Sequence, residues 1–155
     1  MILVDTSIWI DHLRKGNDTL SLLLEQGLVL THPFIIGELL CGSMRNRREI
    51  LELLRTLPAA VAAEHDEVLH FIEAKHLYGA GIGWIDVHLL ASAHLSRAPL
   101  WTSDMRLKRA AESLDIAYSV AAIAPKAERT RQMINKASRG RYNRNAVVSP
   151  AVVFI

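Results

Sequence analysis

Apolar runs alternate with amphipathic stretches along the first 119 residues of the chain. Residues 1–4 (MILV) form a continuous apolar run, which is typical of a buried strand in a parallel sheet. Residues 50–57 instead place Ile50, Leu53, Leu54 and Leu57 at the spacing of an amphipathic helix. The same reasoning predicts further strands at 28–31, 59–63, 99–102 and 116–119, and helices at 19–26, 33–43, 45–57, 66–78, 85–96 and 103–115.

Several residues predict where these helices begin and end. Thr19 suits the N-cap of the helix at 19–26, and Gly27 suits its C-terminal stop. Pro33 suits the first turn of the next helix, because the N–H that proline lacks has no helical partner there. Pro58 ends the amphipathic helix that precedes it.

The order of the predicted elements defines the fold class. Strands that alternate with helices predict an α/β domain with a mostly parallel sheet and helices on both faces. Ligands of such sheets bind beyond the carboxyl ends of the strands. Asp5 directly follows the first predicted strand, and Asp104 follows the strand at 99–102. Both acids are therefore expected at the ligand-binding edge of the sheet.

Composition fits a single globular domain and excludes a membrane protein. The chain has 155 residues, of which 50% are hydrophobic and 22% charged, an ordinary balance for a domain with a real core. No apolar run reaches the 18 or more residues of a membrane span, and Asp5 interrupts the N-terminal apolar run too early for a signal peptide. Cys41 is the only cysteine, which suits the reducing cytoplasm.

Charge divides the chain in two. Residues 1–119 hold 11 Lys/Arg and 15 Asp/Glu, a net charge of −4, whereas residues 120–155 hold seven Lys/Arg and one acid, a net charge of +6. We therefore expect a domain over 1–119 and a basic C-terminal extension over 120–155, for which we predict no catalytic role. The extension suits either an arm that grips RNA or a segment without a function.

Four acids lie in apolar surroundings. On a helix, Glu38 shares a face with Phe34, Ile35 and Cys41, and Asp86 shares a face with leucines and alanines. Asp5 and Asp104 end predicted strands. The alternation of strands and helices allows all four to meet at one end of the sheet.

Each of these acids also has a purely structural explanation. Asp5, Asp86 and Asp104 suit helix N-caps, and Glu38 suits a shielded ion pair with Arg45 or Arg47. Together, however, four acids on buried faces repel one another unless a positive charge lies among them. An oxygen-only ligand set favours a hard divalent cation, Mg²⁺ or Mn²⁺. Such a cation lowers the pKa of bound water and neutralises a reacting phosphoryl group.

Four motifs stand out between residue 1 and about residue 119. They are VDTSIWIDHL at 4–13, IGELLCG at 36–42, GIGWIDVHLLASA at 81–93 and LWTSDMRLKRAA at 100–111. Together and in this order they resemble the motifs of PIN-domain nucleases, and most closely those of the VapC toxins of type II toxin–antitoxin pairs.

This resemblance implies a three-layer α/β/α domain and a Mg²⁺- or Mn²⁺-dependent endoribonuclease. It implies that Asp5, Glu38, Asp86 and Asp104 hold the metal, and that Thr102 and either Thr6 or Ser7 place water or metal. It also implies a homodimer and a small antitoxin that covers the active site, often by inserting a basic side chain. Two alternatives stay open: a PIN-like scaffold that binds RNA or protein without cutting, and an RNA-processing nuclease outside any toxin pair.

Overall fold

The computed structural model describes residues 1–43 and 45–119, and the predicted extension at 120–155 lies outside the described residues. Within the described residues, three short parallel strands form the sheet, in the order β2-β1-β3. Strand β1 (Ile2–Val4) lies in the centre, with Leu3 opposite Leu30 of β2 (Val29–Leu30) and Val4 opposite Trp101 of β3 (Leu100–Trp101). All three residues of β1 are buried, as its continuous apolar run predicts.

In place of the strands predicted at 59–63 and 116–119, the structure has one isolated β-bridge in each segment. Ala59 pairs with Thr31 and Ala117 pairs with Leu100, both in parallel. These segments therefore extend the sheet by one residue pair on each side. Four of the five residues at 59–63 are alanine, which has low β-propensity and little side chain to pack, so this segment forms no longer ladder.

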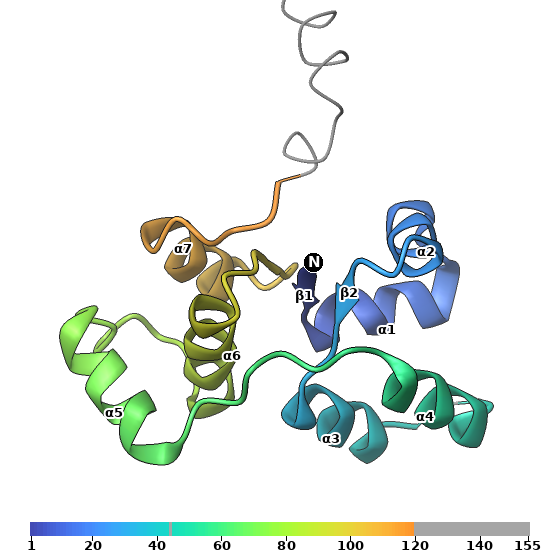
Figure 1. Ribbon diagram of the computed structural model, residues 1–155, viewed down its shortest axis with the longest axis horizontal. Helices are drawn as coiled ribbons and strands as arrows, with labels where there is room; N and C mark the ends of the chain where they lie inside the picture. Colours follow the sequence, from blue (N-terminus) through green and yellow to red (C-terminus); the bar gives the residue numbers. More distant parts are fainter. Residues whose placement is uncertain (44, 120–155) are drawn as a thin grey trace, which may run out of the picture. The chain divides into compact units, whose positions relative to one another are not determined.

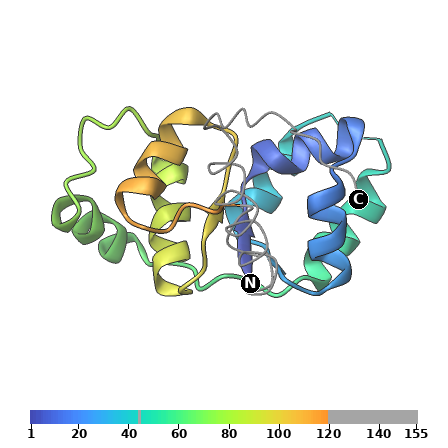
Figure 2. The ribbon, with the colours of Figure 1, turned by 90° about the horizontal axis from the view of Figure 1, so that it is seen from above.

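Seven helices surround the sheet within the described residues. Figures 1 and 2 show the first four helices on one side of the sheet and the last three on the other. This arrangement agrees with the predicted layers. The helices are α1 (Thr6–Lys15), α2 (Asp18–Glu25), α3 (Pro33–Cys41), α4 (Arg47–Thr56), α5 (His65–Ala74), α6 (Trp84–Leu95) and α7 (Met105–Ser113).

Helix α2 begins one residue earlier than the sequence predicts. Its N-cap is Asn17, whose Oδ1 accepts a hydrogen bond from the N–H of Leu20 at 3.0 Å. Asparagine caps at least as well as threonine, and a cap at Asn17 places Asp18 in the first turn, where the helix dipole favours a negative charge. The predicted cap at Thr19 is therefore wrong, whereas Pro33 does begin α3.

Helix α6 runs through the interior of the domain. Every residue from Val87 to Ala93 is buried, including the polar His88 and Ser92, so the helix is enclosed by protein on all sides. It packs against α5, α7 and β3. Asp86 lies in its first turn, immediately before this buried stretch, so the core fixes the position of that acid.

The strand order has a switch point at β1, because β2 and β3 lie on opposite sides of it. Connections from β1 lead through α1 and α2 to β2, whereas β3 is reached through α5 and α6 on the opposite side of the sheet (Figure 1). In open α/β sheets such a switch point creates a crevice beyond the carboxyl ends of the two strands. Asp5 and Thr102 are the residues that directly follow these two strand ends.

Candidate active site

Asp5 links the central strand to helix α1. It is 7% exposed, caps α1 by accepting from the N–H of Ser7 at 3.3 Å, and accepts from the Ser7 hydroxyl at 2.6 Å. The Thr102 hydroxyl donates to the same carboxylate at 2.8 Å. All three hydrogen bonds end on Oδ2, so within the described part of the chain Oδ1 is left without a donor. That oxygen is available to a ligand.

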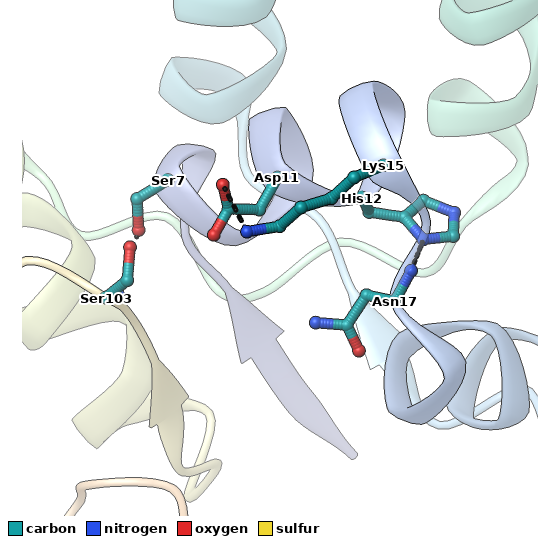
Figure 3. A network of polar contacts seen from close by, with 6 residues as sticks. All are labelled: Ser7, Asp11, His12, Lys15, Asn17 and Ser103. Carbon is teal, nitrogen blue, oxygen red and sulfur yellow. Dashed lines mark hydrogen bonds and ion pairs between the residues drawn. The ribbon is translucent and has the colours of Figure 1, made fainter.

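Hydroxyl groups join the ends of β1 and β3. Thr102 Oγ1 accepts from the N–H of Asp104 at 3.0 Å, and Ser7 Oγ accepts from the N–H of Ser103 at 3.0 Å. Figure 3 shows Ser7 of α1 facing Ser103 in the loop after β3. Short polar side chains thus hold two segments that lie almost a hundred residues apart in sequence.

Asp104 is the N-cap of α7. Its Oδ1 accepts from the N–H groups of Arg106 at 2.8 Å and Leu107 at 2.9 Å. The structural explanation for this acid therefore holds. It does not exclude a second role, because the cap uses only one of the two carboxylate oxygens.

Asp86 is the acid most affected by its surroundings. Burial raises its pKa, and the negative charges of Asp5 and Asp104 raise it further, against a lowering by the Gly83 N–H. The hydrogen bond from Gly83 to Oδ2 measures 2.8 Å and forms part of a capping box at the start of α6. Thr102 donates to the Asp5 carboxylate and accepts from the Asp104 N–H, so one hydroxyl joins these two acids, and both lie near enough to Asp86 for their charges to raise its pKa.

Glu38 reaches the site from α3. It is exposed, and its Oε2 accepts from the Thr6 hydroxyl at 2.6 Å. The alternative of an ion pair with Arg45 or Arg47 is not found among the described residues, where the single ion pair joins Lys15 to Asp11 (Figure 3). Thr6 and Ser7 therefore have separate partners, Glu38 and Asp5.

A buried histidine fixes the helix that carries Glu38. His32 Nδ1 accepts from the N–H of Phe34 at 3.1 Å, which caps α3, and Nε2 lies 3.1 Å from Ser92 Oγ of α6. Ser92 Oγ also accepts from the N–H of Ala63. Burial, and secondarily the charge of His88, lowers the pKa of His32 to about 4. The ring is therefore neutral at pH 7, with its proton on Nε2. His32 is not among the site residues predicted from the sequence, although its position directly before Pro33 marks the start of a helix.

The donor set fits a hard cation in its chemistry and charge. It consists of carboxylates and hydroxyls only, and in the described ranges no ion pair neutralises any of the four acids. Across residues 1–43 and 45–119, however, no three acidic, histidine or cysteine side chains are already grouped closely enough to hold a metal ion. The oxygen atoms needed are present, and binding requires side chains to turn toward a shared ion.

Comparison with known proteins agrees with the fold and the motifs. The sequence model of the family described as PIN domain matches residues 2–113. Two relatives, both named Ribonuclease VapC32 and found in Mycobacterium tuberculosis strains CDC 1551 / Oshkosh and ATCC 25618 / H37Rv, are each 43% identical over 120 residues. That alignment covers 77% of this chain and 97% of each relative. The chain belongs to the PIN-domain family and is of the VapC type.

One further observation concerns membranes. Among the described residues, no helix combines the length and the apolar character that crossing a bilayer requires.

Proposed function

We propose that this VapC-type PIN protein is a metal-dependent endoribonuclease and the toxin of a toxin–antitoxin pair. The observation that carries the proposal is the pair of hydrogen bonds by which the Thr102 hydroxyl joins the Asp5 carboxylate to the N–H of Asp104 at the switch point of the sheet. The raised pKa of Asp86, to which the charges of Asp5 and Asp104 contribute, supports placing Asp86 beside them. The 43% identity to a protein named as a ribonuclease supports the choice of RNA as substrate.

Asp5, Asp86 and Asp104, together with Glu38, would hold Mg²⁺ or Mn²⁺. When bound, such an ion supplies a water of lowered pKa and positive charge to stabilise the transition state of phosphodiester hydrolysis. The identity of the ion rests on the oxygen-only donor set, which both cations accept.

The surrounding residues position the acids through hydrogen bonds. Thr102 and Ser7 fix the Asp5 carboxylate through Oδ2 and keep its Oδ1 turned away from their hydroxyls. Thr6 orients Glu38 through its 2.6 Å hydrogen bond. The Gly83 N–H orients the Asp86 carboxylate through Oδ2 at 2.8 Å, so Oδ1 is the oxygen that would bind the ion or its water.

The proposal includes the partners and location that the family implies. A small antitoxin would cover the acidic site with a basic side chain, which the excess of negative charge attracts. A homodimer is the proposed assembly. The proposed location is the cytoplasm, where RNA is found and where the exposed thiol of Cys41 stays reduced.

Cleavage of labelled total bacterial RNA tests the activity. Purified protein with Mg²⁺ or Mn²⁺ is compared with an EDTA control and with Asp5→Asn. Discrete fragments that vanish in both controls are expected. Cleavage that persists in Asp5→Asn would contradict the assigned site. No cleavage by folded wild-type protein would instead favour the binding scaffold.

Growth arrest tests the toxin. Induced expression in a bacterial host should stop growth, and expression of Asp5→Asn should not. Rescue by the protein encoded directly upstream would support the toxin–antitoxin pair. Active cleavage of RNA without growth arrest would favour an RNA-processing nuclease.

A further inference from the structure

A cavity beside the candidate active site lies between α1, α3 and the start of α4. Its volume is about 400 Å³, within the usual range for small-ligand sites. Helix α1 contributes Ile10, Leu13 and Arg14, which share one helical face because they lie three and four residues apart. The remaining lining residues are Glu38, Leu39, Gly42, Ser43, Arg45 and Ile50.

Glu38 connects the cavity with the candidate active site. This residue lines the cavity, while its Oε2 accepts from Thr6, the neighbour of Asp5. A molecule that contacts both the candidate active site and the cavity would therefore pass Glu38. An RNA strand is such a molecule, since consecutive nucleotides can occupy adjacent subsites.

The walls of the cavity combine apolar surface with positive charge. Ile10 and Leu13 are 37% and 38% exposed, so both present apolar surface to the cavity. Arg14 and Arg45 face the same cavity, and no carboxylate within the described ranges forms an ion pair with either. Apolar walls suit the faces of a nucleobase, and guanidinium groups suit both base stacking and phosphate.

We propose that this cavity is a nucleotide subsite, which holds one unpaired base of the RNA substrate while Arg14 and Arg45 bind a flanking phosphate. The inference rests on the proposed ribonuclease function and adds the residues that select and hold the substrate. Two arginines against one carboxylate give the cavity a net positive charge. That charge favours a phosphate-bearing strand over a basic protein segment.

Binding is measured without cleavage. Fluorescein-labelled hexaadenylate, hexauridylate and an abasic hexaribonucleotide are titrated by fluorescence anisotropy in EDTA. For the wild type, we expect at least one base-bearing hexamer to bind about fivefold more tightly than the abasic one, from stacking of a single base. Equal binding of all three would overturn the base subsite.

Arginine variants test the phosphate contacts. Arg14→Gln and Arg45→Gln should each weaken binding of all three hexamers, and should each reduce the slope of log affinity against log salt by about 0.7. Arg55→Gln is the matched control, since Arg55 is an exposed arginine of α4 that does not line the cavity. Unchanged binding by both cavity variants would overturn the proposal.

A third variant tests the apolar wall. Leu13→Glu places a carboxylate at an exposed position in the wall, so it should abolish the advantage of the base-bearing hexamer while leaving the melting temperature near that of the wild type. If Leu13→Glu does unfold the protein, the two arginine variants still decide the outcome.

Steady-state cleavage separates this inference from the proposed function. Arg45→Gln should raise KM with little change in kcat, because it removes binding rather than chemistry. Normal cleavage by wild type with an unchanged KM in the cavity variants would refute the subsite alone. Weakened binding of the protein encoded next to this chain, with unchanged hexamer binding, would make the cavity a protein-docking groove.

Discussion

At the scale of single residues, the site is a set of carboxylates that each use one oxygen for structure. Asp5 Oδ2 accepts hydrogen bonds from two hydroxyls and a backbone N–H. Asp86 Oδ2 accepts from the Gly83 N–H, and Asp104 Oδ1 accepts from two backbone N–H groups of α7. Structural and chemical roles therefore coexist in the same side chains. Alanine substitutions would remove both roles at once, whereas amide substitutions keep the hydrogen-bond acceptor and remove the charge.

Asp86→Asn should abolish activity while stabilising the metal-free protein. Because burial raises the pKa of Asp86, ionisation of this carboxyl destabilises the fold. The free energy of unfolding therefore falls as the pH rises from 3.8, the pKa in the unfolded chain, through the higher pKa in the folded protein. Asparagine removes that cost and still accepts from Gly83. We expect a higher melting temperature at pH 7 and cleavage reduced about 100-fold or more.

Calorimetry in EDTA and the RNA cleavage assay measure these two effects. Glu73→Gln, an exposed position of α5, is the control and should change neither. A melting temperature of Asp86→Asn below that of the wild type would show that the Asp86 charge stabilises the fold.

Asp104 allows the same separation for a helix cap. Asp104→Asn should leave the free energy of unfolding nearly unchanged, because asparagine caps as well as aspartate. Asp104→Ala should cost about 1 kcal/mol through loss of the bonds to Arg106 and Leu107. Urea denaturation measures both values.

If Asp104 also holds the metal, both variants lose cleavage equally despite their different stabilities. Full activity in Asp104→Asn would assign this residue to the cap alone.

At the scale of elements, helix α3 depends on a neutral imidazole. His32 caps α3 and contacts Ser92 on α6, so it connects helices on the two sides of the sheet. Because its pKa falls from 6.5 to about 4, its contribution is full above pH 6.5 and is lost as pH falls toward 4. The shift corresponds to about 3 kcal/mol at most.

The free energy of unfolding of the wild type should therefore decrease between pH 7 and pH 4.5 more steeply than that of His32→Asn, which keeps a helix-capping side chain. Urea denaturation across this range measures the difference. His76→Asn, at an exposed histidine of the same domain, is the control and should follow the wild type. Parallel curves for the wild type and His32→Asn would show that protonation of His32 does not cause the loss of stability at low pH.

The sequence predicts elements well where the pattern is long and local. The central strand and the helices with a clear apolar stripe are found near their predicted positions, and the four acids lie on the predicted elements. The edge strands at 59–63 and 116–119 were overestimated, because their pairing depends on neighbours that the local sequence does not contain. The separate partners of Thr6 and Ser7, and the role of His32, depend on tertiary contacts in the same way.

At the scale of the whole molecule, every residue of the candidate site lies between positions 5 and 104. The family match ends at residue 113. A protein truncated after residue 119 should therefore cleave RNA with a kcat within about twofold of the full chain. Residues 120–155 carry a net charge of +6. If this segment binds the RNA substrate, its removal should raise KM, because positive charges that contact phosphates are lost.

Parallel cleavage assays of both lengths at two salt concentrations measure this prediction. A truncated protein that folds, as judged by circular dichroism, but has lost kcat would assign a catalytic role to the C-terminal extension.

The hydrogen bonds that join the ends of β1 and β3 also have a consequence during synthesis. Asp5 and Ser7 leave the ribosome first, but their partners Thr102 and Ser103 are nearly the last residues of the domain to emerge. An unfinished chain that stops before β3 has three of the four acids but lacks the strand that holds them together. Interrupted translation of this protein would therefore release fragments that are harmless to the cell's RNA, and the ability to cut would arise only when the domain is complete.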